Sequence, residues 1–315
     1  MISKDDIVAA RERIRPHVHE TPLLASTRLG NMAGGVHLRL KCESMQRTGS
    51  FKARGALNAM MQLSHAEKAR GVVTVSAGNH AQALAWAASL VGAECTTVMP
   101  EGASETKIAA TRGYGGKVEI APGEKSNAFK RAQEIAAEGK VLVHPFEDPR
   151  VAAGQGTVAL EILEQHPDVN TVVVPIGGGG LIAGMAVAIK SSRPDVRVIG
   201  VEPTGAPTMR RSLDAGTPQT IPVQTVADGL AAPMVGEMTL DATRRYVDDV
   251  VLVTDEEILD ALRALMSYAK LVVEPAAAAG VAALLTGKIS MDRGGHVVAV
   301  ISGGNVDIER LKSLL

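Results

Sequence analysis

The chain has 315 residues, of which 46% are hydrophobic, 21% charged and only 2% aromatic. This is an ordinary globular balance, with enough apolar residues to bury the cores of about two domains. Because 33 basic and 34 acidic residues nearly cancel and aromatic residues are scarce, the composition argues against a surface for nucleic acids or anionic membranes.

The cysteines and the apolar runs predict the compartment. Cys42 and Cys95 are far apart in the sequence, so we expect neither a disulfide framework nor a cysteine-rich zinc site. The opening, MISKDDIVAA, carries charged residues and is unlike a signal peptide. The longest uncharged apolar runs, such as LIAGMAVAI from Leu181, fall short of the ~20 residues that a membrane span needs. We therefore expect a protein of the reducing cytoplasm.

Strands and helices are predicted to alternate along the chain. The first predicted helix covers residues 3–15, where Ser3 can cap the N-terminus, Asp6 can complete a capping box and Pro16 follows the end. The predicted strands cover residues 72–76, 95–99, 117–121, 141–144, 171–175, 196–202 and 296–302; the further predicted helices cover residues 79–92, 104–115, 126–139, 152–166, 181–192, 255–270, 275–285 and 307–315. Apolar strands that alternate with helices predict an α/β fold with a parallel sheet covered on both faces.

Three glycine-rich segments follow predicted strands: SAGNH from Ser76, IGGGGL from Ile176 and SGGN from Ser302. Each is expected to open a helix at the carboxyl end of a parallel strand, where backbone N–H groups can face a ligand. Any one of them is also an ordinary turn, and Lys52 in SFKARGA, taken alone, is an ordinary surface lysine. Together the four segments predict a binding site.

The glycine run from Gly177 to Gly180 leaves two cofactors open. No Lys-Ser or Lys-Thr pair follows it, which excludes a P-loop. The pattern Gly178-x-Gly180-x-x-Ala183, with Glu202 near the end of the next strand, fits a dinucleotide fingerprint and hence a nicotinamide-dependent oxidoreductase. That interpretation gives SFKARGA, SAGNH and SGGN no role.

A small phosphorylated cofactor gives every segment a role. If the phosphate belongs to pyridoxal phosphate, a lysine must form a Schiff base with its aldehyde, and Lys52 is the candidate. Phe51 can pack against the pyridine ring, Asn79 can hydrogen-bond the ring hydroxyl, and Ser302 can meet the ring nitrogen. Helix capping is the competing explanation for Asn79, His80 and Ser302.

The motifs TGSFKARGA, SAGNHAQ, IGGGGL and ISGGNVD occur in this order, with GQGTVALEI and ADGL between them. In this order and spacing they resemble the fold type II family of pyridoxal-phosphate enzymes, above all its threonine (serine) dehydratase and serine racemase branch. The resemblance runs from about residue 4 to the C-terminus. It implies two parallel-sheet α/β domains with the cofactor in the cleft between them. It further implies a large cofactor-binding domain of residues 1–50 and 149–315 and a small domain of residues 51–148.

The resemblance also implies a role for each site residue. Lys52 is the Schiff-base lysine, Phe51 its ring neighbour, Asn79 the contact of the ring oxygen and Ser302 the partner of the ring nitrogen. The phosphate is held by the backbone amides of Gly177, Gly178, Gly179, Gly180 and Leu181. The substrate carboxylate is received by the loop that holds Ser76, Asn79 and His80, and Gly229 lies near the substrate.

The implied reaction is the dehydration and deamination of a 3-hydroxy amino acid such as L-threonine or L-serine. Lys52 would take the Cα proton, the β-hydroxyl would leave, and a 2-keto acid and ammonia would be released. A neutral Ser302 at the ring nitrogen makes a weaker electron sink than a carboxylate would, which suits prompt elimination. Feedback control through an additional C-terminal domain is not expected, and a homodimer is the family's usual form.

Two expectations concern departures from relatives. Some of them hold a divalent cation with a glutamate, a carbonyl and an aspartate; the positions here are Glu202, Ala206 and Thr208, and a hydroxyl is a weak ligand for a hard cation, so no metal site is predicted. Racemase relatives carry a serine two residues before the loop asparagine, where this chain has Ala77. A serine racemase-like enzyme, a nicotinamide oxidoreductase and a binding module without turnover remain the alternatives.

Overall fold

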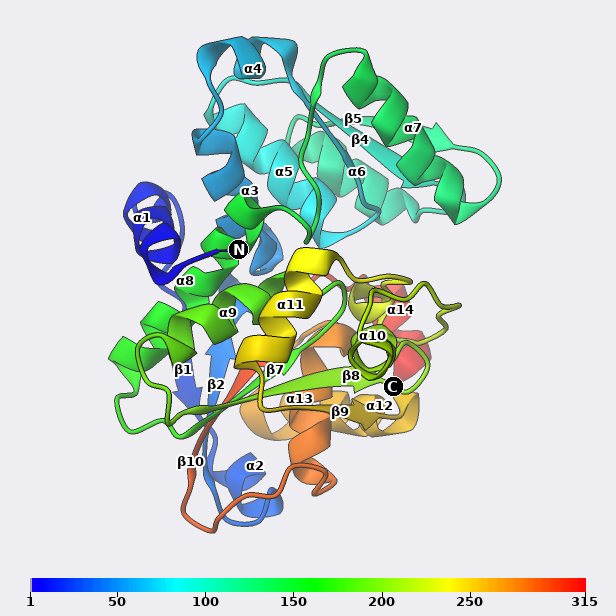
Figure 1. Cartoon of the computed structure of the whole chain (residues 1–315). Helices are drawn as coiled ribbons and strands as arrows, with labels where there is room; N and C mark the ends of the chain where they lie inside the picture. The colour runs from blue at the N-terminus through cyan, green and yellow to red at the C-terminus, as the bar shows by residue number, and fades with distance from the viewer. Residues whose placement is uncertain (1) are drawn as a thin grey trace.

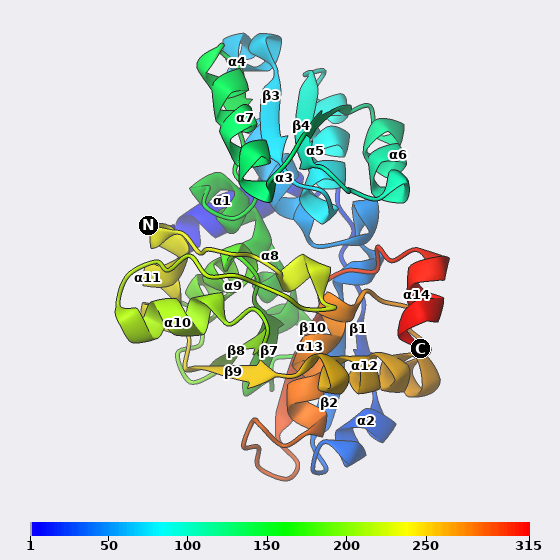
Figure 2. The same cartoon turned by 90° about the vertical axis from the view of Figure 1, so that its right-hand side faces the viewer.

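A computed structural model of the chain, which describes residues 2–315 apart from the side chain of Lys125, has two α/β lobes, one above the other (Figure 1). The lower lobe is built on a six-stranded sheet of order β1-β2-β10-β7-β8-β9, and the upper lobe on a four-stranded sheet of order β5-β4-β3-β6. The view turned by 90° also shows two separate lobes, with α3 (Lys52–Met61) and α8 (Pro149–Gln165) at the level where they meet (Figure 2). The predicted α/β class is confirmed.

The large sheet is parallel except at one edge, where β1 runs antiparallel to β2. Its strands are β1 (Leu23–Ala25), β2 (His37–Cys42), β7 (Thr171–Pro175), β8 (Arg197–Pro203), β9 (Asp249–Val253) and β10 (His296–Ile301). Strand residues alternate between two cores: Val173 packs into one, and Val172 and Val174 pack into the other. The sheet is therefore buried on both faces, as its apolar strands predict.

Helices cover both faces of this sheet. The first core contains residues of α2 (Thr27–Met32), α12 (Asp255–Ala264), α13 (Pro275–Leu285) and α14 (Ile308–Leu314). The second contains residues of α1 (Lys4–Ile14), α8 (Pro149–Gln165), α9 (Gly180–Lys190), α10 (Thr208–Ala215) and α11 (Glu237–Tyr246). Ser3 caps α1 and forms the predicted capping box with Asp6. The predicted helix 255–270 is α12 followed by one π-helical turn, Leu265–Ala269.

The small sheet carries its own helices. Its strands are β3 (Val72–Val75), β4 (Cys95–Pro100), β5 (Lys117–Ala121) and β6 (Val141–Leu142), and its helices are α3 (Lys52–Met61), α4 (His65–Arg70), α5 (Asn79–Leu90), α6 (Glu105–Gly113) and α7 (Lys125–Ala137). All four strands lie between residues 72 and 142, and every strand of the large sheet lies outside this range. The exact boundaries at residues 50/51 and 148/149 stay a prediction.

The three glycine segments are not arranged quite as the sequence predicted. The segment after β3 belongs to the small sheet, whereas the other two follow β7 and β10, which are neighbours in the large sheet. The segment after β10 opens no helix directly, because residues 302–307 form a loop before Asp307 caps α14. The segments meet across the two lobes rather than along one sheet edge.

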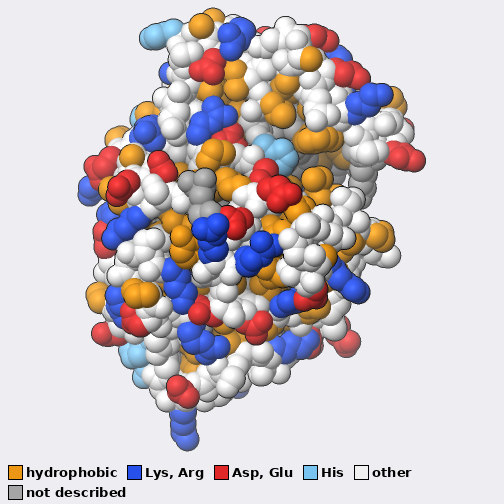
Figure 3. Space-filling view, in the orientation of Figure 1, with side chains coloured by type: hydrophobic (Ala, Val, Ile, Leu, Met, Phe, Trp, Pro, Cys, Tyr) orange, Lys and Arg blue, Asp and Glu red, His pale blue; other side chains and the backbone are white. Residues whose placement is uncertain are grey.

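Three further expectations can be compared with the described residues. None of the helices in residues 2–315 is both long and apolar enough to cross a membrane. Charges of both signs are scattered over the face seen in Figure 3, in keeping with the near-zero net charge. Cys42 and Cys95 are buried and unpaired, as expected.

Candidate active site

Lys52 lies at the start of α3, where the two lobes meet. Its Nζ donates a hydrogen bond to the carbonyl oxygen of Pro145 (2.7 Å) and lies 5.2 Å from the ring centroid of Phe51. Burial lowers the pKa of Lys52 from its usual 10.5 to about 8, although the charge of Glu274 opposes the shift. A far larger fraction of this amine is neutral near pH 7 than for an ordinary lysine, which suits a nucleophile or a base.

The glycine loop after β7 leads into α9 and leaves backbone N–H groups free. Gly179 is the N-cap, with a left-handed φ of 88°, and no side chain caps the helix. The first N–H groups of a helix have no partner within it and can bind an anion. A Cβ atom on Gly178 would collide with the ring of Phe146, and one on Gly180 would lie 3.0 Å from the Cβ of Phe146. Only glycine fits this cradle.

Asn79 is held by partners that the sequence analysis did not single out. Its Nδ2 donates to Oε1 of Glu274 (2.8 Å), and its Oδ1 accepts from Nδ2 of Asn305 (2.8 Å). Asn305 also donates to the carbonyl oxygen of Thr48 (2.7 Å). Burial raises the pKa of Glu274 to about 7, although the hydrogen bond from Asn79 opposes the shift. This network fixes the orientation of the Asn79 amide.

Ser302 and Gly229 lie close to the other predicted residues. The backbone N–H of Phe51 donates to the carbonyl oxygen of Ser302 (3.1 Å), whose side chain is buried. A Cβ on Gly177 would lie 3.0 Å from the carbonyl oxygen of Gly229, and Leu181 is buried in the first turn of α9. The structure thus brings segments from both lobes to one place.

In the loop before α5, the groups available to a ligand are backbone N–H groups more than side chains. Gly78 is the N-cap, no side chain caps α5, and Ser76 Oγ accepts a hydrogen bond from the N–H of Gly78 (3.2 Å). The imidazole of His80 is buried, with Nε2 3.3 Å from the carbonyl oxygen of Val143. Burial and the charge of Lys52 keep the pKa of His80 well below its ordinary value. At this loop, His80 offers its backbone N–H rather than a charged ring.

The carboxylate of Glu202 already has hydrogen-bond partners within the protein. Its carboxylate is fully buried and accepts hydrogen bonds from the backbone N–H groups of Met209 (2.7 Å) and Arg210 (2.9 Å) in α10. The hydroxyl of Thr208 donates to the carbonyl oxygen of Ala232 (2.7 Å). The nicotinamide interpretation required Glu202 to be free for a ribose hydroxyl, and here it caps a helix instead.

The comparisons with known proteins decide the family. The family model described as "Pyridoxal-phosphate dependent enzyme" matches residues 14–303. The chain belongs to this family.

Relatives place this pyridoxal-phosphate enzyme within the family. It is 46% identical to an L-threonine ammonia-lyase of Thermotoga maritima, over 100% of this chain and 78% of the relative. Its fold matches that of maize serine racemase with a TM-score of 0.95 and 39% identity, covering 99% of this chain and 96% of the other. A threonine deaminase of the organism abbreviated T.th. matches with a TM-score of 0.91 and 41% identity, covering 97% of this chain and 99% of the other. The predicted dehydratase and racemase branch is confirmed, and the chain is an ammonia-lyase of that branch.

The residues present fit the cofactor of this family. A phosphate suits the uncapped start of α9, where glycines leave room for close approach. An aldehyde suits the Lys52 amine, whose lowered pKa follows from burial. Ser302 supplies a buried hydroxyl in the loop bonded to Phe51. Pyridoxal phosphate as the cofactor is confirmed; the roles of the individual residues stay a prediction.

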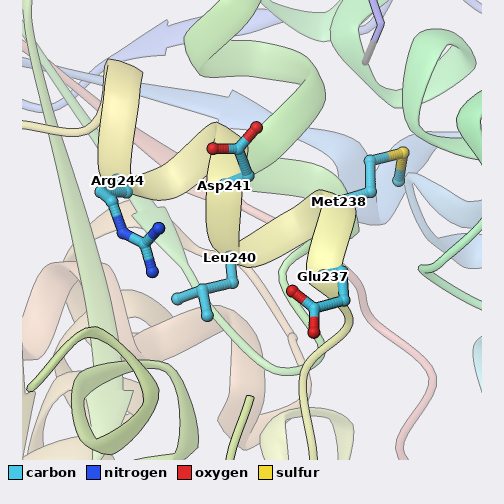
Figure 4. Close-up of a pocket in the computed structure, with 5 residues that line it drawn as sticks. All are labelled: Glu237, Met238, Leu240, Asp241 and Arg244. Atoms are coloured by element: carbon cyan, nitrogen blue, oxygen red, sulfur yellow. The ribbon is translucent and has the colours of Figure 1, made fainter. Parts of the chain in front are cut away.

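A pocket of about 350 Å³ lies elsewhere, along α11 (Figure 4). It is lined by Glu237, Met238, Leu240, Asp241 and Arg244, of which Leu240 is buried. In Figure 4 the side chains of Glu237, Leu240 and Arg244 point to one side of the helix, and Asp241 and Met238 to the other. It contains none of the residues that fit the cofactor, so the candidate active site lies at Lys52 and the α9 cradle.

Glu274 makes a testable contribution to the pH dependence of stability. Its pKa is about 7 in the folded protein against an ordinary 4.5, so folding favours the neutral carboxyl. The free energy of unfolding should therefore fall as the pH rises from about 4.5 to 7. In Glu274→Gln this fall should shrink, by on the order of 2 kcal/mol between pH 5 and pH 8. Denaturant titrations at the two pH values measure it, with exposed Glu12→Gln as the control; equal pH dependence in Glu274→Gln and wild type would refute the assignment.

Proposed function

We propose that this ammonia-lyase acts on a small L-3-hydroxy amino acid, L-threonine or L-serine, and releases a 2-keto acid and ammonia. The observation that carries the proposal is the half-buried Lys52 amine, with its lowered pKa, which bonds Pro145, the residue before the Phe146 that packs on the glycine cradle of α9. Relatives named for L-threonine support the choice of substrate class.

Pyridoxal phosphate, when bound, supplies an electron sink for the bonds of the substrate Cα. The N–H groups at the start of α9 would hold its phosphate, and Asn79, which Glu274 and Asn305 orient, would meet the ring oxygen. The neutral hydroxyl of Ser302 would meet the ring nitrogen. Lys52, once its amine is free, takes the Cα proton; a positioned base of this kind contributes ~10²–10⁴-fold to the rate.

The start of α5 receives the substrate carboxylate. Its N-cap, Gly78, has no side chain, and its first N–H groups, those of Asn79 and His80 among them, have no partner within the helix. The positive end of the helix dipole favours a carboxylate there. Ser76 contributes its hydroxyl. Gly229 lies near the substrate and packs closely on α13, because a Cβ on it would lie 3.0 Å from the Cβ of Ala276.

The assembly that we propose is a homodimer in the cytoplasm, with the domains divided at residues 50/51 and 148/149. Two large apolar side chains that are exposed support an interface: Met45 is 46% exposed and Val272 57% exposed. Their segments meet at Gly304, where a Cβ would lie 3.2 Å from the Cβ of Ser44, next to Met45, and 3.5 Å from the carbonyl oxygen of Val272. Analytical ultracentrifugation of the native protein tests the assembly.

Elimination should prevail over racemisation. Racemisation needs a proton donor on the face of the cofactor opposite Lys52, and the methyl group of Ala77 can neither give nor take a proton. Water can act there, but without the ~10²–10⁴-fold advantage of a positioned acid. Wild type should form keto acid with D-isomer as a minor product, and Ala77→Ser should raise the racemisation-to-elimination ratio. Chiral chromatography of the serine pool beside a keto-acid assay measures both; D-serine formed as fast as pyruvate by wild type would contradict this argument.

The proposed function is tested by keto-acid release from a panel of 3-hydroxy amino acids. L-threonine and L-serine should give 2-oxobutanoate and pyruvate, each with one ammonia, and L-alanine, which lacks a β-hydroxyl, should give neither. Ammonia release with no keto acid, or turnover that depends on a nicotinamide cofactor, would reject the proposal.

A further inference from the structure

The glycine cradle of α9 lies between two supports from distant parts of the chain. On one side, Phe146 packs so closely that a Cβ on Gly180 would lie 3.0 Å from its Cβ. On the other side, a Cβ on Gly179 would lie 2.9 Å from the Cβ of Thr239, a fully buried residue of α11. The shape of the cradle therefore depends on how Phe146 and Thr239 are held relative to each other.

Glu147 ties these two supports together. It directly follows Phe146, and its carboxylate accepts hydrogen bonds from the backbone N–H groups of Met238 (2.6 Å) and Thr239 (3.3 Å). These N–H groups belong to the first turn of α11, where the helix dipole also favours a negative charge. Gly236, the N-cap of α11, leaves the room that the carboxylate fills, because a Cβ there would collide with it.

The same segment also reaches the lysine. Pro145, which precedes Phe146, accepts the hydrogen bond from Lys52 Nζ, and Nδ1 of His144 accepts from the N–H of Glu147 (2.9 Å). Burial lowers the pKa of His144 to about 4, so its Nδ1 stays free to accept this bond at neutral pH. These two bonds involve the backbone at Pro145 and Glu147 and the ring of His144, not the carboxylate of Glu147, so a change of that carboxylate should alter the cradle more than the partner of the lysine.

We propose that Glu147 is a positioning residue for the phosphate of pyridoxal phosphate, which it serves by clamping Thr239 and Phe146 on either side of the α9 cradle. The proposal rests on the proposed function of this site. Glu147 acts through these two neighbours and through the backbone of α11, the helix shown in Figure 4.

The test compares the affinities for pyridoxal phosphate and for pyridoxal, which lacks the phosphate. Glu147→Ala should weaken the binding of pyridoxal phosphate by about 10- to 100-fold, the size expected when hydrogen bonds to a charged group are lost. Its affinity for pyridoxal should change by less than about threefold, an amount below that expected for a lost hydrogen bond. Glu147→Gln keeps one acceptor oxygen and should fall between. Absorbance titrations measure both affinities, and circular dichroism checks the fold.

Glu67→Ala is the matched control. The carboxylate of Glu67 also accepts a hydrogen bond from a backbone N–H at a helix start, that of Ser64 (2.8 Å) before α4, but Glu67 is only half-buried and lies in the small lobe. In Glu67→Ala, the ratio of the affinity for pyridoxal phosphate to the affinity for pyridoxal should equal the ratio in wild type. An unchanged affinity of Glu147→Ala for pyridoxal phosphate, or equal losses for both ligands, would overturn the proposal. Failure of the proposed function would appear separately, as a wild type that binds the cofactor and releases no keto acid.

Discussion

Replacing Lys52 with alanine should abolish both the Schiff-base absorbance of the resting protein and the release of keto acid. The absorbance arises from the bond between the cofactor aldehyde and a lysine amine, and alanine cannot form that bond. The loss of a positioned base alone costs ~10²–10⁴-fold, and the loss of the covalent attachment adds to it. Turnover should therefore fall by at least about 10⁴-fold.

The fold should survive this change. Lys52 opens α3, where alanine is a good helix former, and the side chain makes one hydrogen bond, to Pro145. Absorbance spectra, a keto-acid assay and circular dichroism measure the three properties on one sample. Lys312→Ala, at an exposed lysine of α14, should retain both absorbance and turnover. An active Lys52→Ala variant would reject the assignment of the site.

Strands were predicted well where burial is uniform. The predicted strands 72–76, 171–175 and 296–302 agree with β3, β7 and β10 to within one residue, because these apolar runs are buried along almost their whole length. β2 was missed because Arg39 and Lys41 interrupt its apolar residues. Lys41 is nevertheless fully buried, since its amine donates to Glu161, 120 residues away (2.6 Å).

A glycine explains why one of the helices was not predicted. α3 was not predicted, because Gly55 in SFKARGA suggests a loop. The structure needs glycine there for packing: a Cβ on Gly154 of α8 would lie 2.6 Å from the Cα of Gly55. Two helices that cross this closely require small residues at the contact, and a single sequence does not distinguish such a glycine from one in a turn.

The residues that would contact the cofactor directly were easier to predict from the sequence than the residues that orient them. Lys52, Asn79, the α9 glycines and Asn305 stand in local motifs, although the sequence alone does not show that Asn305 contacts Asn79, 226 residues away. Glu274 lies in none of these motifs and acts on Asn79 from 195 residues away. The one local sign of Glu274 is a lone carboxylate before the apolar run PAAAAGVAALL. Glu147 gives no such sign, because its partners are backbone N–H groups of a helix that the sequence did not predict.

Replacing Arg54 with methionine should destabilise the protein by about 3–5 kcal/mol, the usual cost of removing one partner from a buried ion pair. Arg54 is 1% exposed and makes paired hydrogen bonds to both oxygens of Glu43 (2.8 and 2.8 Å) and of Glu161 (2.6 and 2.9 Å). Lys41 is the second cation of this cluster, so two positive charges balance two negative ones. Without Arg54 the cluster holds two buried carboxylates and a single ammonium group.

The loss of Arg54 should also weaken the binding of the cofactor. Arg54 lies two residues after Lys52 and connects the start of α3 to the large lobe through Glu43 and Glu161. Denaturant unfolding measures the stability, and absorbance titration with pyridoxal phosphate measures the affinity. The surface pair provides the control: Arg245 is 57% exposed beside Asp241, and Arg245→Met should cost at most about 1 kcal/mol.

A double variant separates charge imbalance from lost packing. Arg54→Met combined with Glu161→Gln leaves Lys41 and Glu43, one charge of each sign, and should be less destabilised than Arg54→Met alone, because no net charge then remains buried. If the double variant is the less stable of the two, lost packing rather than charge dominates at this position. A loss below about 1 kcal/mol in Arg54→Met would mean that the cluster contributes no more than a surface pair does.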